Sequence, residues 1–182
     1  MKERLERVRG LESLVRLTNR NDEPFVGFVC AVSEQWVLLA NVSNEVTLDG
    51  YSALRLDRVV NFEDTDDYRY AAFHVEALRL RGQLPLPLPP PVDLTSTESL
   101  IASASTLAPL LTIHPELYPD SCFIGRKPRF ERGALYLEQI DPGAEWLLDD
   151  HEGFSIESIE RVDFGGLYED ALWIVAEARS NV

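Results

Sequence analysis

The strongest pattern of hydrophobic and polar residues in the chain occurs twice, 98 positions apart. Residues 25–40 read FVGFVCAVSEQWVLLA, and residues 123–138 read FIGRKPRFERGALYLE. The two segments align without a gap: Phe, Gly and Leu recur at three positions, and apolar side chains are kept at four more. Each segment holds two runs separated by a few polar residues, which is typical of a β-hairpin. A repeat of this kind predicts two copies of one structural unit.

Weaker similarities extend the repeat toward the end of each copy. Residues 56–59 (LDRV) resemble residues 159–162 (IERV), and residues 71–75 (AAFHV) resemble residues 171–175 (ALWIV). We therefore expect the last strand and the trailing helix of the two copies to correspond at these positions. The spacing grows from 98 to 103 between the hairpin and the last strand, which predicts a longer loop in the second copy.

The first copy is predicted to begin with a helix over residues 1–8, which Gly10 ends. Strands are expected at residues 13–18, 25–33, 35–42, 45–48 and 51–62, with a turn at residues 49–50. A trailing helix follows the acidic residues Asp64, Asp66 and Asp67 and ends at Gly82. Its apolar stripe is expected to consist of residues spaced i, i+3, i+7 and i+10: Tyr70, Phe73, Ala77 and Leu80.

The second copy repeats this plan. A helix is predicted over residues 96–107, and strands are expected at residues 110–114, 123–130, 134–140 and 155–164. The last helix has its apolar stripe at spacing i, i+4 and i+8, on Leu167, Ala171 and Val175. In both hairpins the repeated leucine, Leu39 or Leu137, is predicted to be buried.

These elements divide the chain into a first unit over residues 1–83, a spacer over residues 84–94 and a second unit over residues 95–182. The spacer contains LPLPLPPP, which cannot be helical and is too rich in proline for a central strand. A stiff extended linker is the main interpretation, and a proline-motif ligand is the alternative.

The charge of the chain is strongly acidic and unevenly distributed. The formal net charge is −14; residues 1–91 carry 11 basic and 14 acidic groups, and residues 92–182 carry 6 and 17. Such a surface repels a phosphate backbone and favours a basic partner. The segment MKERLERVRG is not a signal peptide, and no apolar run is long enough to span a membrane. Cys30 and Cys122 are expected to be buried, reduced thiols of a cytoplasmic protein.

The order of elements, a short helix, five strands and a trailing helix, resembles the Sm-like small barrel. The strand residues 26–29 (VGFV) followed by residues 36–39 (WVLL) look like the first Sm motif, as do residues 124–127 and 135–137. Residues 159–172 resemble the ending of tandem Sm-like proteins from bacteria. The fold implied is mainly β with flanking helices (α+β): two tandem five-stranded antiparallel barrels, each with a leading and a trailing helix.

The Sm family also binds RNA, through an Asp and an Asn near the turn between the second and third strands and through an Arg-Gly pair before the last strand. The corresponding turns here read SEQ at residues 33–35 and ERG at residues 131–133, without Asn. The Leu-Arg-Gly at residues 80–82 lies at the end of a predicted helix. Residue by residue, the resemblance therefore supports the fold and not the RNA contacts.

The sequence predicts a binding protein and not an enzyme, because no motif for a nucleophile, a zinc site or a phosphate-binding loop is present. No cofactor or metal is expected; a divalent cation at residues 149–152 is weighed against a solvated loop tip, which is favoured. Candidate partner-binding residues are the acids of that loop, Asp149, Asp150 and Glu152. Trp146 and Trp173 are expected in the core, not as a stacking platform for bases.

The alternative site is the dense basic group, formed by Arg126, Lys127, Arg129 and Arg132. On a regular strand, Arg126 and Lys127 point to opposite faces, so the four residues form one patch only if the hairpin bends. We expect protein–protein interaction, for example as an acidic immunity or antitoxin-type inhibitor of a basic protein. The alternative is an Sm-like RNA-binding regulator.

Overall fold

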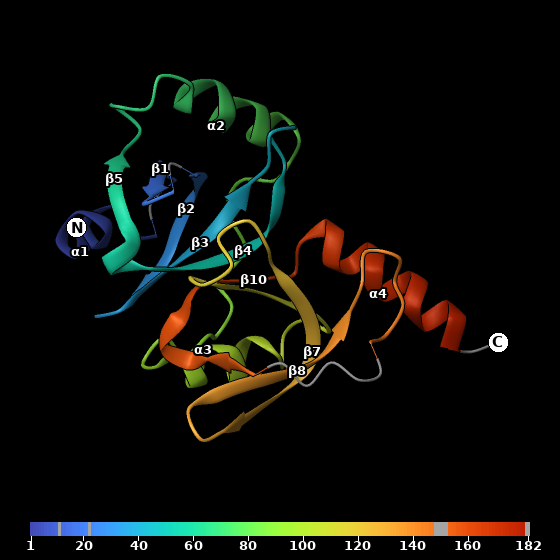
Figure 1. Ribbon diagram of the computed structural model, residues 1–182. Helices are drawn as coiled ribbons and strands as arrows, with labels where there is room; N and C mark the ends of the chain where they lie inside the picture. The colour runs from blue at the N-terminus through green and yellow to red at the C-terminus, as the bar shows by residue number, and fades with distance from the viewer. Residues whose placement is uncertain (11, 22, 148–152, 181–182) are drawn as a thin grey trace. The chain divides into compact units, whose positions relative to one another are not determined.

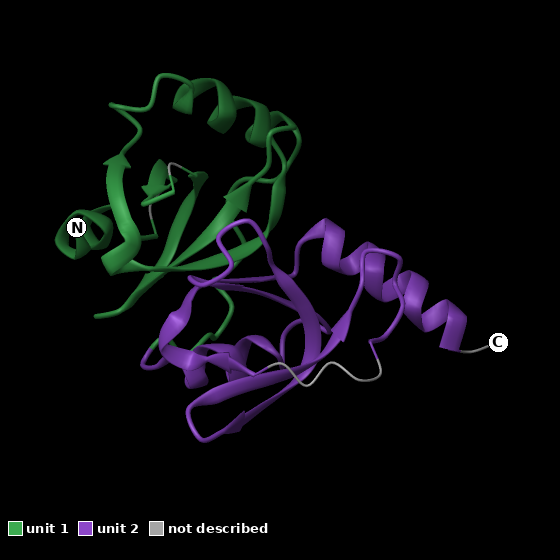
Figure 2. Cartoon of the chain, in the orientation of Figure 1, with its two compact units in different colours: residues 1–94 green, residues 95–182 purple. Residues whose placement is uncertain are grey.

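A computed structural model describes the chain except for residues 11, 22, 148–152 and 181–182 (Figure 1). The chain forms two compact units, Met1–Leu94 and Thr95–Val182 (Figure 2). In the described residues, each unit holds five antiparallel strands and two α-helices. The α+β class predicted from the sequence is therefore confirmed.

The first unit starts with a helix and ends with one. Its elements are α1 (Lys2–Val8), β1 (Leu14–Asn19), β2 (Pro24–Val32), β3 (Trp36–Val42), β4 (Leu48–Arg55), the 3-10 turn η1 (Leu56–Arg58), β5 (Val59–Glu63) and α2 (Ala71–Leu80). The strands lie in the order β5-β1-β2-β3-β4. The expected turn at residues 49–50 is wrong, since β4 runs through it and the chain turns at η1 instead.

The second unit has the same order of elements. These are α3 (Thr97–Ala104), β6 (Leu111–Pro115), β7 (Phe123–Glu131), β8 (Ala134–Ile140), β9 (Phe154–Ser155), η2 (Ile156–Ser158), β10 (Ile159–Phe164) and α4 (Leu167–Ser180). The strands lie in the order β10-β6-β7-β8-β9, which matches the first unit strand for strand. Ser96 caps α3, with its side chain accepting a hydrogen bond from the backbone N–H of Ser99.

The two long hairpins, β2–β3 and β7–β8, share one register. Gly27 pairs with Asn41, and Gly125 pairs with Gln139, so the 98-residue spacing holds on both strands of the hairpin. The register then shifts at residues 29–31 of β2 and at residues 126–129 of β7. A bulge at the same place therefore bends both hairpins. The repeated segments occupy corresponding strands, as the sequence predicts.

The later part of the repeat is aligned differently from the sequence prediction. Val59 is the first residue of β5 and pairs with Asn19, whereas Ile159 is the first residue of β10 and pairs with Pro115. Val59 therefore corresponds to Ile159 and not to Val162. The similarity of LDRV to IERV is misleading because pairing with the first strand, and not residue type, sets the position of the last strand.

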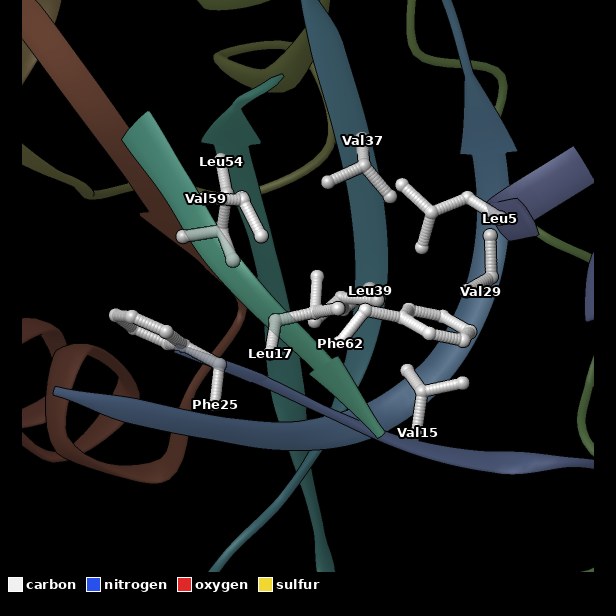
Figure 3. Packing of buried hydrophobic residues seen from close by; sticks show 10 residues of the cluster. All are labelled: Leu5, Val15, Leu17, Phe25, Val29, Val37, Leu39, Leu54, Val59 and Phe62. Carbon is white, nitrogen blue, oxygen red and sulfur yellow. The ribbon is translucent and has the colours of Figure 1, made fainter. Parts of the chain in front are cut away.

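Both faces of the first unit's sheet are covered by apolar side chains. Leu5 of α1 packs on one face against a cluster of strand residues (Figure 3): Val15, Leu17, Phe25, Val29, Val37, Leu39, Leu54, Val59 and Phe62. The helix α2 covers the other face, where its buried residues meet Leu14 and Phe28. Leu39 is buried as predicted, and so is Leu137 in the second unit.

The proline-rich segment 84–94 contains no helix or strand. Leu84 is buried and Leu86 is partly buried, and both pack against the cluster beneath α2. The start of the expected spacer is thus held against the first unit through these two leucines. None of the helices in the described part of the chain is long and apolar enough to cross a membrane.

Candidate functional site

The last helix, α4, packs on its unit through a face other than the predicted one. Leu172 and Ala176 are only 5% and 2% exposed, and they contact Leu110, Ile140 and Ala144. The expected stripe of Leu167, Ala171 and Val175 faces solvent, with Leu167 64% exposed. The prediction that this stripe marks the packed face is therefore wrong. Small Ala176, one turn after Leu172, lets the helix approach the residues beneath it closely.

The solvent-facing side of α4 is unusually apolar. Its large exposed residues are Leu167, Tyr168, Ile174 and Val175, and the small Ala171 and Ala178 are exposed between them. A helix that packs with one apolar stripe normally presents polar residues on the opposite side. We call the exposed residues Leu167, Ala171, Ile174 and Val175 the outer stripe of α4. Contiguous exposed apolar residues of this kind mark interaction surfaces.

The trailing helix of the first unit shows the same reversal. The predicted stripe is again wrong: Tyr70, Phe73 and Leu80 are exposed, while α2 packs through Ala71, Val75 and Leu78. The charged residues of the two helices differ, however. Arg79 of α2 forms an ion pair with Glu12. The helix α4 carries three acidic residues, Glu169, Asp170 and Glu177, and one basic residue, Arg179.

A hollow of about 290 Å³ lies at the beginning of α4. It is lined by residues of the loop before β6 and of the turn into α4: Leu107, Ala108, Pro109, Leu110, Gly165, Gly166, Leu167, Glu169 and Asp170. Most of the lining side chains are apolar, and the two carboxylates supply the negative charge. Because Leu167 belongs to both features, the hollow continues the outer stripe.

The carboxylates of the hollow are held differently. Glu169 Oε1 accepts a hydrogen bond from Thr112 Oγ1 at 2.5 Å, which ties the start of α4 to β6. The side chain of Asp170 is exposed and forms no ion pair with any residue that the structure describes. Asp170 is therefore the acid of the hollow that a ligand reaches most directly.

Next to Thr112, β6 and β10 carry a satisfied polar network. Asp163 Oδ2 accepts a hydrogen bond from Arg161 Nε at 2.7 Å and lies 2.8 Å from His114 Nε2. These mutual contacts stabilise the pairing of the two strands and do not assemble an activated nucleophile.

Cys30 and Cys122 are both free thiols. Cys30 is half-buried and Cys122 is exposed, contrary to the expectation of two buried cysteines.

The basic group is arranged differently from a regular strand. Arg126 Nε and Lys127 Nζ both donate to the Glu138 carboxylate, at 3.0 and 2.9 Å. The sequence predicts that they come together only if the hairpin bends, and the bulge in β7 supplies this bend: Lys127 has a φ of 50°, and both side chains reach the same carboxylate. Hydrogen bonds from Lys127 and Arg126 hold the pKa of Glu138 below its usual range.

The other two basic residues lie toward the hairpin tip. Arg129 forms an ion pair with Glu131 at 3.2 Å. Arg132 and Gly133 have φ values of 51° and 80°, which fits the two-residue turn between β7 and β8. Three of the four cations are therefore paired with carboxylates.

Arg126 also stacks on the two tryptophans of the second unit. Its guanidinium carbon lies 3.8 Å from the ring centroid of Trp146 and 5.7 Å from that of Trp173. The two indole rings are nearly perpendicular, with centroids 6.4 Å apart, and both pack partly buried against the cluster under α4. The two tryptophans expected to be core are thus at its edge, and Arg126 covers one face of the Trp146 ring.

The acidic loop predicted as a partner-binding site, Asp149, Asp150 and Glu152, lies outside the described residues.

The composition of α4 indicates the outer stripe, although the periodicity of its apolar residues does not. Apolar residues occupy nine of the fourteen positions of α4, too many for one face of the helix.

The chain was compared with protein-family models, with curated proteins and with solved structures. No family model, curated protein or solved structure matches it.

Proposed function

We propose that the protein acts by binding another protein, without catalysis, through the outer stripe of α4. The observation that carries this proposal is that α4 is apolar on two sides while only one side packs against its own unit. Burying the outer stripe in a partner's groove would remove apolar surface from water, which is the main driving force of such helix-in-groove contacts.

The partner we propose is basic. The outer stripe is accompanied by the acids of α4, and the second half of the chain is the strongly acidic half. Complementary charge would speed association and select against acidic partners and nucleic acids. An immunity or antitoxin-type inhibitor that masks a basic protein is one concrete form of this function. The acids of the loop at residues 149–152 would add to the same attraction.

The scaffold we propose for this function is a tandem of Sm-like small barrels. Support comes from the common strand order of the two units, from the bulges at corresponding places in β2 and β7, and from the 3-10 turn that precedes β5 and β10. The Sm-like RNA-binding alternative is less well supported because three of the four cations it would use are paired with carboxylates.

The proposal is tested by isolating the partner and measuring its affinity for matched variants. The wild-type chain is used to capture proteins from cells of its source, and each captured protein is purified and titrated by calorimetry. Ile174→Asp places a charge in the outer stripe and should weaken binding at least tenfold, because the carboxylate would lose its water in the apolar contact that the stripe makes. Phe73→Asp, a matched change on the exposed face of α2, should leave the affinity unchanged.

Two results would contradict the proposal. Equal affinity of wild type and Ile174→Asp would exclude the outer stripe, and loss of binding in Phe73→Asp alone would assign the contact to α2. A third variant, with Asp149→Asn, Asp150→Asn and Glu152→Gln combined, should reduce the association rate and its salt dependence while keeping the fold.

A further inference from the structure

We infer that the hollow at the beginning of α4 receives an arginine or lysine side chain of the protein partner. This inference rests on the proposed function, since the hollow continues the outer stripe through Leu167. It adds the identity of the partner's anchor residue, which the stripe alone does not specify. The argument depends on the size of the hollow, its walls and its charge.

The size of the hollow suits one side chain. Its volume of about 290 Å³ is at the lower limit of sites for small organic ligands. The walls are formed largely by leucine, alanine and proline side chains, and Leu107 on the rim is itself partly exposed. The methylene stem of an arginine or lysine can pack against such walls while its charged end stays at the opening.

The charge of the hollow selects a cation. A helix N-terminus by itself favours an anion, because its free N–H groups carry partial positive charge. Here Glu169 and Asp170 bring two full negative charges to the first turn of α4, which outweigh the partial positive charge of the helix end. Glu169 is held in place by Thr112, and Asp170 is exposed at the rim. An anionic ligand would therefore be repelled, and a cationic one attracted.

The inference is tested by NMR titration of the isotope-labelled full chain with three small probes that share one stem. These are n-butylguanidinium, the neutral n-butanol and the anionic n-pentanoate, each with a four-carbon stem. Only n-butylguanidinium should shift the amide resonances of the hollow, at Leu107, Gly165 and Gly166, in a saturable manner. Asp170→Asn should weaken this binding about 1.5- to fivefold, the range expected for a solvent-exposed ion pair. Asp120→Asn, an equal loss of charge at an exposed site that does not line the hollow, should have no effect.

Each other outcome overturns the inference. Equal binding of n-butanol would mean that the hollow takes an apolar anchor, and preferred binding of n-pentanoate would mean an anion site at the helix end. Absence of saturable shifts would exclude an anchor in the hollow. Leu107→Ser should weaken the binding of n-butylguanidinium, because it removes part of the apolar wall of the hollow. Unchanged binding would mean that the probe binds elsewhere.

Failure of this inference is distinguishable from failure of the proposed function. Ile174 does not line the hollow, so Ile174→Asp should weaken partner binding at least tenfold, while n-butylguanidinium still binds in the hollow. Conversely, Asp170→Asn should weaken the binding of the partner while leaving the outer stripe intact. Partner binding that depends on Ile174 but not on Asp170 would retain the stripe and exclude the basic anchor.

Discussion

The carbonyl oxygen of Ala40 lies so close to Gly27 that a Cβ atom at that position would be only 2.4 Å from it. Gly125 has the same relationship with the carbonyl oxygen of Glu138, at 2.6 Å. In both hairpins the strands therefore approach each other at the glycine, which lies one or two residues before the register shift. No side chain fits there without displacing the backbone of the paired strand.

Gly27→Ala and Gly125→Ala should each lower the free energy of unfolding by about 1–3 kcal/mol, the usual cost of overpacking. Restricting the unfolded chain favours alanine by about 0.4–1 kcal/mol, which is too little to offset a backbone clash. Urea denaturation measures the change. Gly143→Ala is the matched control, because its new methyl group meets only the Asp141 side chain. Unchanged stability of Gly27→Ala would show that the strands are further apart.

Leu39 and Leu137 are expected to contribute equally to their own units. Both are buried on the third strand of their unit, so truncation to alanine should cost about 2–5 kcal/mol in each case. Chemical denaturation of the two single variants decides this. Leu88→Ala, at a fully exposed leucine, should cost less than about 0.5 kcal/mol. An equally small loss at Leu39 would mean that its strand is turned the other way.

The orientation of α4 can be tested by substitutions on its two sides. Leu172→Ala should destabilise the protein by about 2–5 kcal/mol, because the leucine packs against Leu110 and Ile140. Ile174→Ala should change stability by less than about 0.5 kcal/mol, since Ile174 is 59% exposed. Thermal or urea unfolding of the two variants gives the comparison. The reverse order of the two losses would restore the orientation predicted from periodicity.

The lowered pKa of Glu138 makes a prediction for acid titration. Its carboxylate is stabilised first by Lys127 and then by Arg126. A carboxylate with a depressed pKa contributes stability that is complete above its ordinary pKa and is lost as the pH falls through the depressed value. Because the side chain is half exposed, this contribution is small.

Lys127→Met should therefore raise the pKa of Glu138 toward the ordinary glutamate value, measured by NMR titration of the side-chain carboxyl carbon. Arg129→Met is the control, because Arg129 pairs with Glu131 instead. A pKa of Glu138 that is the same in wild type and Lys127→Met would contradict the observed hydrogen bond.

Binding of single-stranded RNA should be weaker than micromolar at physiological salt. Two carboxylates, Glu138 and Glu131, pair with three of the four cations and reduce the positive charge of the basic group, and the net charge of the chain repels phosphate. Fluorescence anisotropy with a labelled oligonucleotide over a salt series tests this. Tight binding with a steep salt dependence, abolished when Arg126, Lys127, Arg129 and Arg132 are all replaced, would favour the RNA-binding alternative.

Local patterns in the sequence predicted the elements and their order well. The hairpins at residues 25–42 and 123–140, the helices at the start of each unit and the burial of Leu39 and Leu137 follow from side-chain periodicity, which depends only on neighbouring residues. The close approach at Gly27 and Gly125 is likewise marked in the sequence by the one residue type without a Cβ.

Contacts between distant residues decided the rest. Two apolar stripes compete on α4, and only the shape of the surface formed by Leu110, Ile140 and Ala144 selects Leu172 and Ala176 as the packed one. The bulge in β7 brings Arg126 and Lys127 to one carboxylate, against the alternation of a regular strand. The register of the last strand depends on pairing with the first. Each of these outcomes is determined by tertiary packing. The local arrangements have similar energies, and contacts between segments far apart in the chain select one of them.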